Sequence, residues 1–166
     1  MENEINKFRI LLLEDNENEY YNYKNAINKA LIDLNVANKA QPILNEYEKE
    51  FELIRLYNNY LKKKSKFSEL PEKIIEIINN DILPEEGDVI YFIDINWNNE
   101  NGNKNGFEFI KECLNVVNKK NIILLTNYTL MAEHDSYKYL HKGPINDEFI
   151  VKIRHCITLT DVFDRL

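Results

Sequence analysis

Three short runs of almost entirely apolar residues, each followed by polar side chains, constrain the fold of this chain most. The runs are Phe8–Leu13, Val89–Ile93 and Ile122–Leu125. Apolar runs of this length without alternation are typical of strands buried on both faces, as in parallel sheets. Segments with helical periodicity separate the runs. This alternation predicts an α/β fold, in which helices cover both faces of a parallel sheet.

The same patterns give the expected boundaries of the elements. We expect strands at residues 8–13, 36–44, 88–93, 121–126 and 136–142, and helices at residues 20–34, 46–64, 71–80, 107–118 and 147–166. Pro42 bounds or interrupts the second of these strands, because proline cannot donate to a ladder of hydrogen bonds.

The composition excludes several classes of protein. With 166 residues, 44% of them hydrophobic, the chain is long enough for one domain, which we expect to span residues 1–166. A net charge of −7 disfavours nucleic-acid binding, which needs a basic surface. Apolar runs are too short for a membrane helix, and the acidic N-terminus does not look like a signal peptide. We therefore expect a cytoplasmic protein that binds neither nucleic acid nor membrane.

Polar side chains follow the expected strands at the point where each strand ends. Glu14 and Asp15 follow the first strand, Asp94 the third, Thr126 the fourth and Lys142 the fifth. Because the carboxyl ends of parallel strands open on one edge of the sheet, we expect these five side chains to converge.

The chemistry of that set indicates a metal and phosphate site. Three carboxylates crowd together in ionised form only when a cation is present, and oxygen ligands of this kind suit Mg²⁺. Lys142 and Thr126 would hold phosphoryl oxygens, by charge and by a hydroxyl hydrogen bond. Asp94 would then be the nucleophile that forms an aspartyl phosphate.

These residues, in this order, resemble the receiver domain of response regulators in two-component signalling, over nearly the whole chain. That family has an acidic pair after its first strand, a phosphoacceptor aspartate after the third, serine or threonine after the fourth and lysine after the fifth. The positions that match here hold Glu14, Asp15, Asp94, Thr126 and Lys142.

The resemblance implies further features. The fold would be flavodoxin-like, a doubly wound sheet of five parallel strands in the order 2-1-3-4-5. Asn96 would offer its main-chain carbonyl to the metal. Tyr139, three residues before the lysine, would change rotamer on phosphorylation. The segment Gly106–Ile110 resembles the start of the family's third helix.

The chain also departs from the family. Asp15 and Asp94 lie far apart in sequence, so we interpret residues from about 45 to 80 as a helical insertion between strands 2 and 3. The stretch 126–142 is short, so we expect the fourth helix to be short or missing. Asn127 replaces a small residue, and Gly143 separates the lysine from a proline that the family places directly after it.

The leading hypothesis is a stand-alone phospho-receiver. A histidine kinase or phosphotransfer protein would give its phosphoryl group to Asp94, with Mg²⁺ bound, and the output would pass to a downstream protein. The chain would be no enzyme beyond its own phosphorylation and dephosphorylation. Whether the chain forms a homodimer is left open.

Two other functions compete with this one. Asn127, the insertion and the altered turn after the lysine motivate a receiver-like binding module that does not depend on phosphorylation. A phosphatase of the haloacid-dehalogenase type also orders Asp, Thr and Lys along its sheet. Its acid/base aspartate, two residues after the nucleophile, corresponds here to Asn96, which argues against it. Individual residues have simpler interpretations too: Glu14 and Asp15 as helix caps, and Tyr139 as a core tyrosine.

Overall fold

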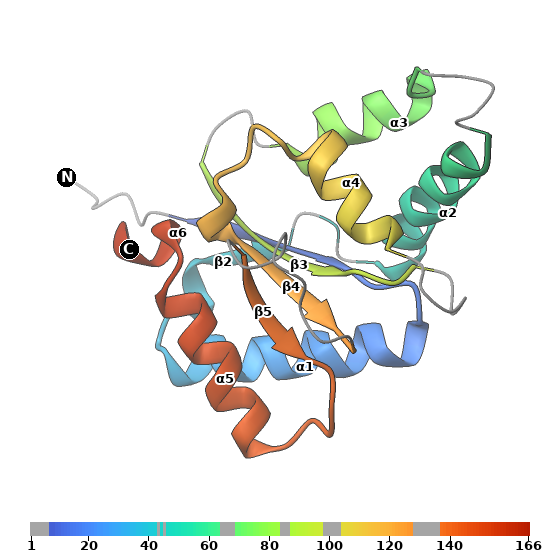
Figure 1. Cartoon of the computed structure of the whole chain (residues 1–166). Helices are drawn as coiled ribbons and strands as arrows, with labels where there is room; N and C mark the ends of the chain where they lie inside the picture. The colour runs from blue at the N-terminus through green and yellow to red at the C-terminus, as the bar shows by residue number, and fades with distance from the viewer. Residues whose placement is uncertain are drawn as a thin grey trace.

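The computed structural model describes residues 7–42, 44, 46–63, 69–83, 87–97, 104–127 and 137–166. Its centre is a five-stranded parallel sheet in the order β2-β1-β3-β4-β5 (Figure 1). The strands are β1 (Phe8–Leu13), β2 (Ala40–Pro42), β3 (Asp88–Asp94), β4 (Ile122–Thr126) and β5 (Lys138–His141). The predicted α/β class, flavodoxin-like architecture and strand order are confirmed.

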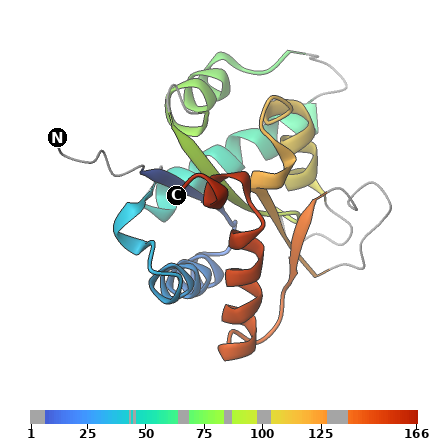
Figure 2. The same ribbon diagram turned by 90° about the vertical axis from the view of Figure 1, so that its left-hand side faces the viewer.

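Helices cover both faces of this sheet. They are α1 (Glu17–Asp33), α2 (Tyr47–Lys63), α3 (Glu72–Ile77), α4 (Asn105–Cys113), α5 (Asp147–Thr158) and α6 (Asp161–Asp164), with 3-10 turns at η1 (Ala37–Lys39) and η3 (Lys119–Asn121) and a π turn at η2 (Ile78–Ile82). Helices α1 and α5 lie on one face, and α2, α3 and α4 lie on the other (Figures 1 and 2).

The central strands are continuously apolar because each supplies side chains to two cores. On β3, Tyr91 and Ile93 face the core beneath α2, α3 and α4, while Ile90 and Phe92 face the core beneath α1 and α5. The alternation of a pleated strand therefore divides one apolar run between two helical layers. No helix among the described residues is long and apolar enough to cross a membrane.

Some element boundaries differ from those expected. Strand β2 has three residues, because the η1 turn occupies the positions before it. The expected last helix is two helices, since the Thr160 side chain accepts a hydrogen bond from Phe163 N and begins α6. The hydroxyl of Thr160 also donates to Ile157 O, 2.7 Å away. Such local hydrogen bonds compete with a continuous helix.

The crossover from β2 to β3 contains both α2 and α3. Leu53, Ile54 and Tyr57 of α2 are fully buried against the sheet, so α2 is part of the helical layer. Whether the segment 45–80 is an insertion, and whether the whole chain is one domain, stay predictions. The fourth helix expected to be short or missing falls on residues 128–136, outside the described residues.

Candidate functional site

The register of the sheet brings the predicted strand-end residues to one edge. Leu13 of β1 pairs with Ile93 of β3, so Glu14 lies level with Asp94. Thr126 of β4 pairs with His141 of β5, and Lys142 N donates to Thr126 O across 2.7 Å. Parallel pairing thus places at one edge groups that are far apart in sequence.

Three carboxylates form a cluster at this edge. Glu14, Asp15 and Asp94 each offer an oxygen, and these oxygens lie within 4.8 Å of one another. Glu14 is 0% and Asp94 2% exposed, while Asp15 is partly exposed. Burial raises the pKa of Glu14, and the nearby charge of Asp94 raises it further. Burial also raises the pKa of Asp94, against the opposing effect of Lys142.

Lys142 is the cation of this cluster. Its ammonium lies 2.9 Å from Glu14 Oε2, 3.1 Å from Asp94 Oδ1 and 2.8 Å from Glu19 Oε2. Burial disfavours the charged form of Lys142, but Asp94 and Glu14 outweigh that effect and hold its pKa above its usual range. The lysine therefore stays charged and opposes the rise in the pKa of Glu14 and Asp94.

The donor set fits a divalent cation. Formally, the four carboxylates of Glu14, Asp15, Glu19 and Asp94 and the one ammonium of Lys142 leave three negative charges. The second carboxyl oxygen of Asp94, Oδ2, is buried and accepts no hydrogen bond from the described residues. Mg²⁺ would neutralise the excess negative charge and take carboxylate oxygens as its ligands. It would also give the buried Oδ2 a partner.

The other predicted site residues differ in their position and burial. They are Asn96, Thr126 and Tyr139. Asn96 N donates weakly to Asp94 Oδ1, 3.4 Å away, so this residue lies beside Asp94. The role of its carbonyl stays a prediction. Thr126 is buried at the end of β4. Tyr139 lies on β5 and is 50% exposed, so the alternative of a core tyrosine is wrong.

Sequence reasoning missed Glu19, which lies in the first turn of α1. The cap of this helix is Asn16, whose side chain accepts a hydrogen bond from Glu19 N at 3.0 Å. Asparagine followed three residues later by glutamate resembles a capping box, and this was the available signal. Here Asn16 N donates instead to Glu14 Oε1, 3.3 Å away. The Glu19 carboxylate is therefore left to bind Lys142. The cap is therefore neither Glu14 nor Asp15.

Gly106 is a second residue whose role the sequence did not reveal. It lies in the first turn of α4, and a Cβ atom at this position would lie 1.9 Å from Asp94 O. Gly106 N also donates to Ile95 O at 2.9 Å. A side chain here would push α4 away from the main chain of Asp94.

Helix α2 contacts both loops that hold the acidic cluster. Tyr47 Oη donates to Asp15 O across 2.6 Å. Asn58 Nδ2 donates to Trp97 O at 3.0 Å, in the loop after Asp94. Nothing in the pattern of α2 signalled these contacts, because each depends on tertiary packing.

Comparisons with protein-family models, with curated proteins and with solved structures found no match. The function must therefore be argued from the residues of the site.

Proposed function

We propose that this chain is a phospho-receiver in which Asp94 accepts a phosphoryl group. The observation that carries the proposal is the asymmetry of the Asp94 carboxylate. Its Oδ1 lies 3.1 Å from the Lys142 ammonium, while its Oδ2 has no hydrogen-bond donor among the described residues. One oxygen is thus held by the ammonium, while the other has no donor that a ligand would have to displace.

The donor would be a phosphorylated histidine of a kinase or phosphotransfer protein. An oxygen of Asp94 attacks phosphorus, and the new O–P bond forms as the P–N bond breaks, with its electron pair returning to the imidazole. Lys142 remains cationic and holds a phosphoryl oxygen by charge, and Thr126 donates its hydroxyl to another. Output would pass to a further protein that recognises the phosphorylated form.

The site also needs a cation. A phosphoryl group carries negative charge to an edge that already has an excess of carboxylates. Glu14, Asp15 and Asp94 would hold Mg²⁺, with the main-chain carbonyl of Asn96 as a further ligand. When bound there, the ion neutralises the charge that the phosphoryl group brings.

Acetyl phosphate provides a direct test. We expect the purified chain, incubated with acetyl phosphate and Mg²⁺, to gain the mass of one phosphoryl group, and to lose it on treatment with hydroxylamine. Asp94→Asn should gain nothing. Asp88→Asn is the matched control, because Asp88 begins the same strand at its opposite end. No mass gain in the wild type, with acetyl phosphate or a phosphoramidate donor, would contradict the proposal.

A second candidate is a receiver-like binding module that does not cycle phosphate. One observation favours it: Lys142 already contacts three carboxylates, so the cluster is partly neutralised without phosphate. In that case Asp94→Asn would leave the binding of a partner unchanged.

A further inference from the structure

Helix α2 connects the two loops that carry the acidic cluster. Near the start of the helix, Tyr47 Oη donates to Asp15 O in the loop after β1, 2.6 Å away. Further along, Asn58 Nδ2 donates to Trp97 O in the loop after β3, at 3.0 Å. From Tyr47 to Asn58 an α-helix rises by about 16 Å, and the inner side of α2 is buried in the core. The helix is therefore a rigid spacer between the two loops.

Asn58 is a buried amide, 5% exposed, and both of its ends have partners. Its Nδ2 donates to Trp97 O, and its Oδ1 accepts from Asn105 Nδ2 at 2.8 Å. Because a carbonyl oxygen can only accept, the amide nitrogen must face Trp97, which leaves the amide oxygen for Asn105. Asn105 is the first residue of α4. One side chain of α2 thus joins the two ends of the connection between β3 and α4.

The main chain is held on both sides of Asn96. Before it, Ile95 O accepts a hydrogen bond from Gly106 N at 2.9 Å. After it, Trp97 O accepts the hydrogen bond from Asn58, and the Trp97 side chain is almost fully buried. The peptide group that carries the Asn96 carbonyl therefore has a fixed neighbour on each side.

We propose that Asn58 is a positioning residue for the binding of Mg²⁺, because its amide fixes the loop that carries the main-chain ligand at Asn96. This inference rests on the proposed function, which assigns the cation to the carboxylates of the cluster and to that carbonyl. Asn58 supplies no ligand itself and acts through the main chain. Tyr47 has the same role for Asp15 at the other end of the helix. Replacing a residue that orients a metal ligand typically lowers metal affinity by about 10- to 100-fold.

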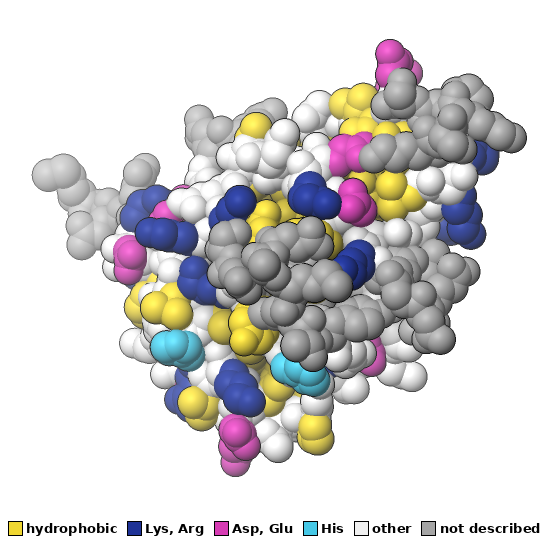
Figure 3. Space-filling view, viewed as in Figure 1, with side chains coloured by type: hydrophobic (Ala, Val, Ile, Leu, Met, Phe, Trp, Pro, Cys, Tyr) yellow, Lys and Arg dark blue, Asp and Glu magenta, His cyan; other side chains and the backbone are white. Residues whose placement is uncertain are grey.

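The test is a titration of the full-length, isotope-labelled protein with MgCl₂, without any phosphoryl donor. The indole N–H of Trp97 gives a single NMR signal, because the chain has one tryptophan. That signal reports on the loop after Asp94, and the main-chain amide of Asp15 reports on the loop after β1. Acidic side chains are dispersed over the face of the molecule seen in Figure 3, and they attract Mg²⁺ weakly. NaCl therefore keeps the ionic strength constant throughout.

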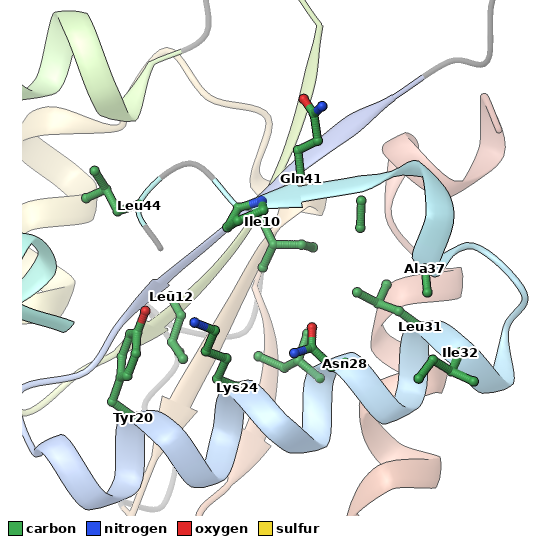
Figure 4. Close-up of a pocket in the computed structure, with 13 residues that line it drawn as sticks. Ile10, Leu12, Tyr20, Lys24, Asn28, Leu31, Ile32, Ala37, Gln41 and Leu44 are labelled. Carbon is green, nitrogen blue, oxygen red and sulfur yellow. The ribbon is translucent and has the colours of Figure 1, made fainter. Parts of the chain in front are cut away.

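Asn58→Leu keeps a side chain of similar size but removes both hydrogen bonds of the amide. We expect the dissociation constant of Mg²⁺ to rise about tenfold. Asn59→Leu is the matched control on the exposed side of α2. Asn28→Leu makes the same change on α1, in the wall of a cavity between α1 and β2 (Figure 4). Both controls should bind Mg²⁺ like the wild type.

Leu53→Ala separates positioning from stability. Leu53 is fully buried on α2, so its truncation destabilises the protein while both hydrogen bonds of Asn58 stay in place. Urea unfolding measures the loss of stability in Leu53→Ala and in Asn58→Leu. The first variant should keep the Mg²⁺ affinity of the wild type. If Leu53→Ala weakens Mg²⁺ binding as much as Asn58→Leu does, Asn58 merely stabilises the fold and the proposal is wrong.

Two tyrosine variants decide the proposal if Asn58→Leu does not fold. Tyr47→Phe removes only the hydroxyl that donates to Asp15 O. It should raise the dissociation constant of Mg²⁺ about threefold, the effect of one hydrogen bond. Tyr60→Phe, on the same helix, removes a hydroxyl that donates to Glu112 Oε1 at 2.8 Å, and should leave the affinity unchanged. Equal affinities in these two variants would overturn the proposal.

The results for this proposal and for the receiver can be told apart. A wild type that does not respond to Mg²⁺, or an Asn58→Leu variant with wild-type affinity, would overturn the positioning role. In the second case the phosphorylation of Asp94 is unaffected as a hypothesis. Because the titration contains no phosphoryl donor, a wild type that binds Mg²⁺ but gains no phosphoryl group from acetyl phosphate would contradict the receiver proposal alone.

Discussion

Two regions of this molecule bury carboxyl groups and stabilise them differently. At the carboxyl edge of the sheet, Glu14 and Asp94 share the ammonium of Lys142. Between α1 and α2, Glu50 has a neutral partner, the hydroxyl of Tyr20. Burial raises the pKa of the carboxyl groups in both regions. The charge of Lys142 opposes that rise in the first region, and the hydrogen bond from Tyr20 opposes it in the second. The two regions therefore oppose the same cost of burial, the first with an ionic partner and the second with a neutral one.

Removal of Lys142 should have the largest effect on stability. Lys142→Met leaves Glu14 and Asp94 buried without a cation, and we expect a loss of about 3–5 kcal/mol in the free energy of unfolding at pH 7. Urea unfolding measures it. The control is Lys152→Met, an exposed lysine on α5, which should change stability by less than about 0.5 kcal/mol. Equal losses in the two variants would show that the ammonium does not hold the cluster.

Glu50→Gln should have the next largest effect, and it should depend on pH. Burial raises the pKa of Glu50 from 4.5 to about 8 in the folded protein, so the folded state binds the proton more tightly than the unfolded one. Its contribution to stability is therefore complete below about pH 4.5 and is lost as the pH rises through 8.

We expect Glu50→Gln to be more stable than the wild type at pH 9 by about 2 kcal/mol, and similar to it at pH 4.5. Urea unfolding at pH 4.5, 7 and 9 checks the difference. Glu52→Gln, on the same helix but exposed and paired with Lys73, is the control and should follow the wild type. Parallel pH profiles for the wild type and Glu50→Gln would refute a raised pKa.

The sequence predicted the first region well and the second not at all. Glu14, Asp94 and Lys142 are strand-end residues, and the regular register of a parallel sheet places such positions together whatever their separation in the chain. Glu50 lies in the first turn of α2, and its burial depends on tertiary contacts rather than on the register of a strand. Its partner Tyr20 comes from a different helix, so no local pattern marks this glutamate as buried.

The boundaries of helices and strands, and the helix caps, were predicted only in part from the sequence. The apolar runs located β1, β3 and β4 closely. The short β2 and the break between α5 and α6 depend instead on single side-chain and main-chain hydrogen bonds. Such bonds override the hydrophobic periodicity on which the expected boundaries rested.

Tyr20→Phe should have a smaller effect. It removes the hydroxyl that donates to Glu50 Oε1, so a buried acceptor loses its partner, at a cost of about 1 kcal/mol. Tyr139→Phe is the matched control, because the Tyr139 side chain is half exposed. Thermal unfolding of both variants checks the pair. A larger loss for Tyr139→Phe would reverse the relative importance assigned to these two tyrosines.

Mg²⁺ should have an effect no larger than that of Tyr20→Phe. When its concentration is several times its dissociation constant, we expect about 1 kcal/mol of stabilisation in the wild type and almost none in Asp15→Asn. Calorimetry with MgCl₂, against NaCl of equal ionic strength, measures the shift in Tm. Glu50→Gln should keep the whole response, since it lies outside the acidic cluster. The same response in Asp15→Asn and the wild type would contradict the cation site.

Strand β2 has a consequence for behaviour in concentrated solution. An open sheet edge is a template on which another molecule can add a strand. Here one edge offers only the three described residues Ala40–Pro42, and the last has no amide hydrogen to donate. At the other edge, β5 begins with Lys138, a type of residue that opposes pairing with a second copy. Both edges therefore resist edge-to-edge aggregation.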